Sequence, residues 1–284
     1  MKPAPLAFAI ILSTLTPLYA HSQADTIPSA APVLAPGETA EQRGRHLLNE
    51  MVTALGGDAW LHRKDMTVKG RTAAFFRGAP TGFVVEYSGN RQFPVDGRPE
   101  AERIGFITDK SMILPGKKID IVQVYVNGNG YEVTFKGTKP LPKDQVADYF
   151  RRRNHSIEDV VLNWLHQPGV VVISEGTSMV ARRLSEKVTV LTDNNDAVTI
   201  DLDATTHLPL RREFKWRNEE FKDWDKDVEE YDDYHTIQGL PTAMTLTRYH
   251  DDDMTSQRFY EKVEYNSNLS PDLFNPDKLL QKKQ

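Results

Sequence analysis

The stretch AVTIDLDATTHLPLRREFKW, residues 197–216, shows most clearly how this chain folds. In its first half Val198, Ile200 and Leu202 lie on one face of an extended chain, and the polar residues between them lie on the other. A polar turn follows, and the alternation resumes after Pro209. A period of two is typical of β-strands with one buried face, so this stretch predicts an antiparallel hairpin.

The same alternation occurs along most of the chain, between turns rich in Gly, Asn, Asp or Pro. The clearest turn is Asn127-Gly128-Asn129-Gly130, because Asn and Gly accept the positive φ that a tight hairpin needs. Strands are predicted at residues 66–76, 81–88, 102–108, 119–126, 131–135, 170–175, 187–191, 197–202, 208–216, 229–236, 243–250 and 258–265. Strands in clusters, without regular βαβ alternation, predict an antiparallel α+β fold.

Two regions have helical periodicity instead. Residues 39–42 (TAEQ) match a capping box, and apolar residues then recur at helical spacing from Leu47 to Leu55. Residues 143–167 are also helical in pattern, with a start signal at Ser156. Each of these helices should pack one apolar face onto the sheet.

The first 24 residues have the layout of a cleavable secretory signal peptide, with an apolar run at 6–18 and small residues after it. That run is too short for a membrane span, which needs about 20 apolar residues. Residues 25–38, rich in Pro and Ala, are expected to form a flexible leader, and 39–284 a single domain. We therefore expect a periplasmic protein without a transmembrane span in its mature form. No cysteine follows the apolar run, so it should not itself be a lipoprotein.

Composition excludes several classes of protein. The chain has 284 residues, 35 basic and 40 acidic side chains, a formal charge of −5 and no cysteine. Disulfide bonds, zinc sites with thiolate ligands and cysteine nucleophiles are therefore excluded. A pI near 5.9 supplies no basic field for nucleic acid, which is not an expected partner.

Catalytic and cofactor motifs are missing. The segment Gly176-Thr177-Ser178-Met179-Val180 lacks the second glycine of a nucleophile elbow, and no phosphate-binding glycine loop follows a strand. The histidines are scattered, without the i, i+4 pair that would hold a metal. The acid-rich residues 217–233 do not fit a calcium-loop register, and we interpret them as a solvated edge strand and loop. No catalytic residue, cofactor or metal is predicted.

Aromatic side chains are spread over the expected strands and helices. Most of them would fill an ordinary core, but a curved sheet covered by helices could place some on a concave apolar face. Such a cavity would suit an acyl chain or a similar apolar ligand. The candidates for its lining are Trp60, Phe75, Phe83, Tyr87, Phe106, Tyr131, Trp164 and Phe214.

Three stretches resemble the LolA-like superfamily of periplasmic lipoprotein-sorting carriers, including secreted proteins described only as outer membrane lipoprotein-sorting proteins. They are ALGG at 54–57 with DMTVKGR at 65–71, TIDLD at 199–203 with THLPLR at 206–211, and EYDDY at 230–234 with GLP at 239–241 and the strand 242–250. The resemblance implies a curved antiparallel sheet, a half-open barrel, with helices across its concave face. It also implies an apolar cavity that holds acyl chains.

The family's proline–arginine strand is matched in part by residues 98–104 (RPEAERI), which keep Pro99 and Arg103. Arg103 is therefore a candidate for holding a lid shut over the cavity, and the alternative is a surface arginine.

Three functions stay open. The first is a non-covalent carrier of lipid or lipoprotein acyl chains, which needs a cavity of some hundreds of Å³. The second is a non-catalytic envelope protein with a filled core and a protein partner, which needs an exposed apolar patch. The third is a secreted hydrolase, which needs two titratable groups with opposed pKa shifts in a polar cleft.

Overall fold

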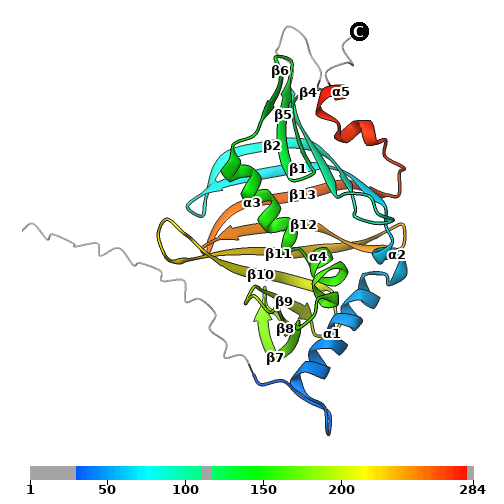
Figure 1. Ribbon diagram of the computed structural model, residues 1–284, viewed down its shortest axis with the longest axis vertical. Helices are drawn as coiled ribbons and strands as arrows, with labels where there is room; N and C mark the ends of the chain where they lie inside the picture. Colours follow the sequence, from blue (N-terminus) through cyan, green and yellow to red (C-terminus); the bar gives the residue numbers. More distant parts are fainter. Residues whose placement is uncertain (1–29, 110–116, 280–284) are drawn as a thin grey trace, which may run out of the picture.

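The computed structural model describes residues 30–109 and 117–279, so the predicted signal peptide lies outside the described residues. The described residues form one antiparallel sheet of 13 strands in the order β6-β5-β4-β3-β2-β1-β13-β12-β11-β10-β9-β8-β7 (Figure 1). The strands are β1 Asp65–Phe76, β2 Ala79–Gln92, β3 Ala101–Asp109, β4 Lys117–Val126, β5 Asn129–Thr134, β6 Gly137–Pro140, β7 Val171–Val180, β8 Arg183–Leu191, β9 Ala197–Asp203, β10 Pro209–Arg217, β11 Trp224–Ile237, β12 Leu240–His250 and β13 Asp253–Tyr265.

The sheet is curved but does not close, because β6 and β7 are edges that do not pair with each other. Its two halves join where β1 pairs with β13, and the register of that pair shifts between Lys69 and Gly70. A Cβ at Gly70 would lie 2.1 Å from the Phe259 carbonyl oxygen, so only glycine allows this close approach. A bulge of this kind increases the local twist, which helps the long sheet to coil.

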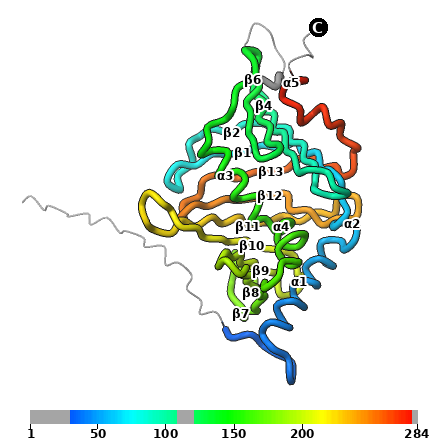
Figure 2. Tube along the Cα trace, viewed as in Figure 1, coloured from blue at the N-terminus to red at the C-terminus, as the bar shows by residue number. Residues whose placement is uncertain are grey.

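Helices pack on the concave face of the sheet. They are α1 Ala40–Leu55, α2 Asp58–Leu61, α3 Lys143–Asn154, α4 Ile157–Leu162 and the single turn η1 Trp164–His166. Two further single turns, η2 Pro271–Phe274 and α5 Pro276–Leu279, follow the last strand. As Figure 1 shows, α3 and α4 run across the middle strands while α1 lies along the β7–β8 end. The chain's last elements, η2 and α5, lie instead beside β3 to β5 (Figure 2).

The main core fills the space between α1, α4 and the concave face. Leu47, Leu48 and Met51 of α1 are fully buried there against strand residues such as Val172 and Ile200. A second, small cluster of Ala101, Val124 and Phe274 joins β3 and β4 to η2. Helix α1 starts with the predicted capping box, in which Thr39 Oγ1 accepts from the Gln42 amide at 3.1 Å.

The curved antiparallel α+β fold is thus confirmed. The predicted tight turn is present, since β4 ends at Val126 and β5 begins at Asn129, with Asn127 and Gly128 at φ 50° and 74°. The part of the predicted leader that the structure describes contacts the sheet, because Ala30 exchanges two backbone hydrogen bonds with Thr177.

The interpretation of residues 217–233 as an edge strand and loop was wrong. Residues 218–223 do form a loop, but β11 lies between β10 and β12 in the middle of the sheet. Its charged residues include Asp227 and Glu229, which are buried. Arginines on the two neighbouring strands pair with them, and this pairing is what lets an acidic strand lie inside the sheet.

Candidate functional site

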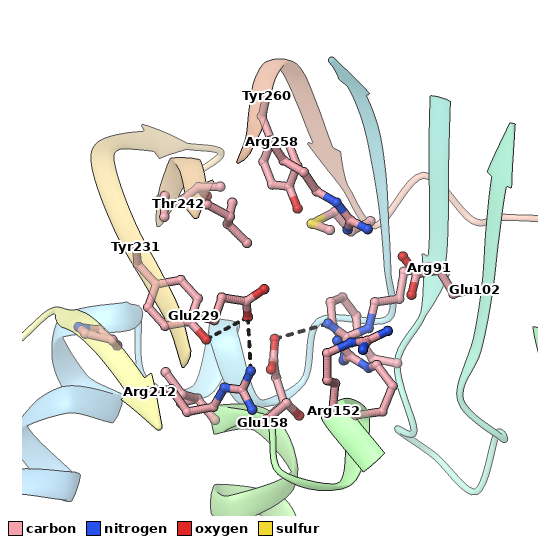
Figure 3. Close-up of a pocket in the computed structure, with 18 of the residues that line it drawn as sticks. Arg91, Glu102, Arg152, Glu158, Arg212, Glu229, Tyr231, Thr242, Arg258 and Tyr260 are labelled. Atoms are coloured by element: carbon pink, nitrogen blue, oxygen red, sulfur yellow. Dashed lines mark hydrogen bonds and ion pairs between the residues drawn. The ribbon is translucent and has the colours of Figure 1, made fainter. Parts of the chain in front are cut away.

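A cavity of about 330 Å³ lies between the concave face of the sheet and helices α3 and α4 (Figure 3). Strands β1 to β4 and β10 to β13 provide its walls, and α3 and α4 cover it. This volume lies at the lower end of the range of small-molecule sites. The fold therefore leaves the space that a carrier function requires.

Part of the lining is apolar. Trp60 and Phe106, both predicted cavity residues, line it together with side chains such as Ile104 and Leu246. Trp60 belongs to the short helix α2, which follows α1, and Phe106 stands on β3. These side chains offer an acyl chain a surface from which water is readily displaced.

The rest of the lining is strongly polar. Seven arginines and three glutamates contact the cavity: Arg63, Arg91, Arg152, Arg153, Arg212, Arg248, Arg258, Glu102, Glu158 and Glu229. Tyrosines also line it, among them Tyr149, Tyr231 and Tyr260. The lining is therefore not the purely apolar surface that the sequence predicted, and its ionised side chains carry an excess of positive charge.

One ion-pair network is centred on Glu158, in the first turn of α4. Its Oε1 accepts from Arg63 Nη2 at 2.9 Å and from Arg91 Nη1 at 3.2 Å (Figure 3). Burial alone would raise the pKa of Glu158, but Arg91 and Arg63 outweigh it and lower the pKa to about 2. Ser156 caps α4 by accepting from the Asp159 amide at 3.2 Å, which fixes the helix end that carries Glu158.

A second network is centred on Glu229. In the sheet register Glu229 stands directly opposite Arg212 on one side and Arg248 on the other. Arg248 Nε donates to Glu229 Oε1 at 2.7 Å, and the Tyr231 hydroxyl donates to Oε2 at 3.0 Å. Burial would raise the pKa of Glu229, but Arg248 and Arg212 lower it to about 2. Arg212, only 1% exposed, also pairs with Asp227 at 3.2 Å.

Two cavity arginines have no such partner. Within the described residues, neither Arg152 of α3 nor Arg258 of β13 makes an ion pair or a side-chain hydrogen bond. The Arg258 guanidinium instead lies 5.9 Å from the centre of the Tyr87 ring. Burial lowers the pKa of Arg152, and the neighbouring Arg248 lowers it further. Positive charge is thus concentrated where α3 faces β12 and β13.

The other predicted cavity residues lie elsewhere. Tyr87, Trp164 and Phe214 are buried in the main core, and none of them lines this cavity. Phe83 is 73% exposed near the β1–β2 turn. Phe75 and Tyr131 are half-buried and do not line the cavity either. Of the eight predicted aromatic residues, the structure therefore places only Trp60 and Phe106 at the cavity.

Arg103, the predicted lid residue, is directed away from the cavity. Its neighbours Glu102 and Ile104 both line the cavity, and alternate residues of a strand point to opposite faces. Its Nη1 donates to Asn90 Oδ1 at 3.3 Å. A contact with lid carbonyls over the cavity is therefore not made by this side chain.

Sequence reasoning missed the charged lining, although a signal was present. Arg212 lies in phase with the buried Leu210 and Phe214, which predicts that its guanidinium also points inward. A charged residue at an inward position of a strand needs a partner of opposite charge. That requirement could have directed attention to Glu229, on the next strand along the chain.

The hydrolase alternative requires two titratable groups with opposed pKa shifts in a polar cleft. The pKa values of Glu158 and Glu229 both shift downward, so these two cavity carboxylates are not an acid and base with opposed shifts. One group of side chains outside the cavity, Asp225, His250 and Asp251, has ligand atoms within 4.8 Å of one another. It lies on the surface, and the Lys226 amide donates to Asp251.

Comparison with known proteins supports the fold. No sequence-family description matches the chain, and no curated protein is similar enough in sequence to count as a relative. A DUF1329 family protein from Desulfovibrio piger superposes with a TM-score of 0.54 and 13% identity, covering 84% of this chain and 98% of that one. A putative outer membrane lipoprotein-sorting protein domain from Vibrio parahaemolyticus superposes with a TM-score of 0.53 and 13% sequence identity. This match covers 85% of this chain and 100% of that one.

A LolA superfamily protein from Nitrosomonas europaea is also similar, with a TM-score of 0.46 and 12% identity over 84% of this chain and 97% of that one. The first two of these similarities show that the protein shares the fold of the DUF1329 family protein and of the lipoprotein-sorting domain, a fold of the kind that the sequence resemblance implied. No helix of the residues described here is both long and apolar enough to cross a membrane.

Proposed function

We propose that this protein is a periplasmic carrier that binds a lipid or the acyl chain of a lipoprotein, non-covalently, in the cavity between α3 and the sheet. The observation that carries the proposal is the cavity itself, about 330 Å³ with Trp60 and Phe106 in its apolar part. The LolA-like fold supports it, because a similar solved structure is described as a lipoprotein-sorting domain. Export through the predicted signal peptide would bring the protein to such cargo.

The size of the hydrophobic contribution shows what else the cavity must provide. Burying the roughly ten methylenes of a twelve-carbon chain gives about 8 kcal/mol, at about 0.8 kcal/mol each. Association costs at least about 4 kcal/mol in lost freedom, which leaves binding near the millimolar range. Polar contacts to the rest of the ligand must therefore add to the affinity. The charged lining described above is able to supply them.

Helix α3 is the element that would open the cavity. Tyr149 is its one buried residue, and the rest of the helix is partly or fully exposed. Tyr149 stacks on Tyr125 of β4 with ring centres 3.7 Å apart and donates its hydroxyl to Glu102 at 2.6 Å. Val146 and Phe150 of α3 also pack against the core, and Arg153 pairs with Glu100, so opening the cavity would break these contacts as well.

A protein partner is a second candidate for the envelope role. Exposed aromatic side chains stand at two neighbouring hairpins, Phe76 and Phe83 by the β1–β2 turn and Phe221 and Trp224 by the β10–β11 loop. Exposed apolar groups of this kind are typical of interaction surfaces. Such a surface is compatible with a carrier that meets a donor or an acceptor.

Native mass spectrometry of the mature protein from a periplasmic extract, before and after organic extraction, tests the carrier function. We expect a bound mass that solvent removes and that is identified as a lipid or acylated peptide. Leu246→Trp, which places an indole in the cavity, should abolish that mass, and Val84→Trp at an exposed strand position should retain it. A single ligand-free mass, with no uptake of added fatty acid or lipopeptide, would refute the proposal.

A further inference from the structure

The arginines that line the cavity divide into paired and unpaired groups. Arg63 and Arg91 share Glu158, while Arg212 and Arg248 flank Glu229. Arg153 is held by Glu100 at 2.8 Å. Among the residues that the structure describes, Arg152 and Arg258 make no ion pair, although Asp227 and Asp148 attract Arg152 and Glu229 attracts Arg258 from further away. The unpaired charge is thus confined to one region of the lining.

That region is built by α3 on one side and by β12 and β13 on the other. Arg258 stands opposite Leu246 in the sheet register, so Arg248, two residues along β12, is its diagonal neighbour on the same face. Arg152 projects from α3, and the positive charges of Arg248 and Arg258 both lower the pKa of its guanidinium group. Figure 3 shows Arg152 and Arg258 entering the cavity from opposite sides.

Tyr87 lies in the core beneath Arg258, whose guanidinium is 5.9 Å from the centre of the Tyr87 ring. Its side chain is only 4% exposed, and its hydroxyl has no hydrogen-bond partner within the described structure. The nearby carboxylate, Glu102, already accepts from the Tyr149 hydroxyl at 2.6 Å. Tyr87 does not line the cavity, so it supports Arg258 from the core side and leaves the guanidinium N–H groups of Arg258 to face the cavity.

We propose that Arg152 and Arg258, with Arg248 beside them, form a subsite for the anionic head group of the bound amphiphile, a carboxylate or a phosphate. The inference rests on the proposed carrier function and specifies its ligand class. Guanidinium groups bind carboxylate and phosphate through paired N–H donors, and an anion here would neutralise charges that otherwise repel one another. The acyl chain would then extend toward Trp60 and Phe106.

The test compares three twelve-carbon ligands by isothermal titration calorimetry: dodecanoate, dodecyl phosphate and the uncharged 1-dodecanoylglycerol. We expect the two anions to bind at least tenfold more tightly than the glycerol ester, with a difference that shrinks as salt is added. Arg152→Gln/Arg258→Gln should remove the preference, so that the two anions bind no more tightly than the ester. Arg71→Gln, at an exposed strand arginine outside the cavity, should keep the preference.

Equal binding of all three ligands would overturn the anion subsite and leave the carrier function standing. Failure of all three to bind would refute the carrier function itself. Inorganic phosphate alone should bind weakly, and if it bound as tightly as dodecyl phosphate the site would belong to a free anion, which also overturns the proposal. Arg152→Gln alone should fold at least as stably as the wild type in urea, because it removes a charge that has no partner.

Discussion

Glu229 is the residue whose replacement tests the electrostatic design of the cavity most sharply. Its carboxylate lies between Arg212 and Arg248 and is 8% exposed. Glu229→Gln keeps the shape of the side chain and removes the charge. Both arginines would then lose their shared partner, and Arg212 would retain Asp227. Because buried guanidinium groups are costly without a carboxylate, the variant should be destabilised.

The size of this effect follows from the pKa of Glu229, which is about 2 in the folded protein against an ordinary value of 4.5 for a glutamate. At about 1.4 kcal/mol per pKa unit, the ionised carboxylate stabilises the folded state by roughly 3 kcal/mol at neutral pH. The folded pKa is depressed, so this stability is fully present above about pH 5 and is lost as the pH falls from there through about 2. The penalty of Glu229→Gln should therefore shrink on acidification.

Urea unfolding of the wild type and of Glu229→Gln at pH 7 and pH 3 measures this directly. We expect a free energy of unfolding lower by roughly 3 kcal/mol in the variant at pH 7, and less than half that difference at pH 3. The control is Glu264→Gln, whose 53% exposed side chain pairs only with Lys262 and should cost less than about 1 kcal/mol. A difference that stays constant between the two pH values would refute the reasoning.

Two further predictions concern the helices that support the site. A Cβ at Gly44 would lie 2.9 Å from the Ser174 amide nitrogen, so the side chain of Gly44→Val should push α1 away from β7. We expect this variant to lower the free energy of unfolding in urea by about 1–3 kcal/mol. The control variant Asn49→Val, on the exposed face of α1, should lower it much less. Ser156→Ala removes the N-cap of α4 and should cost about 1 kcal/mol in the same assay, and an unchanged midpoint would show that the cap does not hold α4 in place.

Most of the fold could be predicted from the sequence because burial on one face imposes a period of two on each strand. Residues 197–216 are the clearest example, and β9 and β10 occupy them almost completely. The short strand β6, Gly137–Pro140, was missed because its residues show no alternation and it depends on pairing with β5. The start of β8 was missed for a related reason, since a turn with positive φ at Ala181 and Arg182 carries no Gly or Asn signal.

The site was harder to predict than the fold. Aromatic residues indicated a cavity, but their sequence positions do not show which of them line it and which fill the core. Trp60 and Phe106 line the cavity, whereas Trp164 is buried close to His155, with ring centres 5.3 Å apart. The charged lining arises only when the sheet register places Arg212, Glu229 and Arg248 in one row, and that register joins residues distant in sequence.

The central claim is that the cavity under α3 holds an amphiphile with its chain inside. A crystal of the protein grown with 12-bromododecanoic acid tests it, because anomalous scattering locates the bromine at the end of the chain. The account predicts a bromine peak inside the cavity near Trp60 and Phe106, with the carboxylate beside Arg152 and Arg258. Bromine peaks found only on the outer surface, with the cavity containing nothing but water, would contradict it.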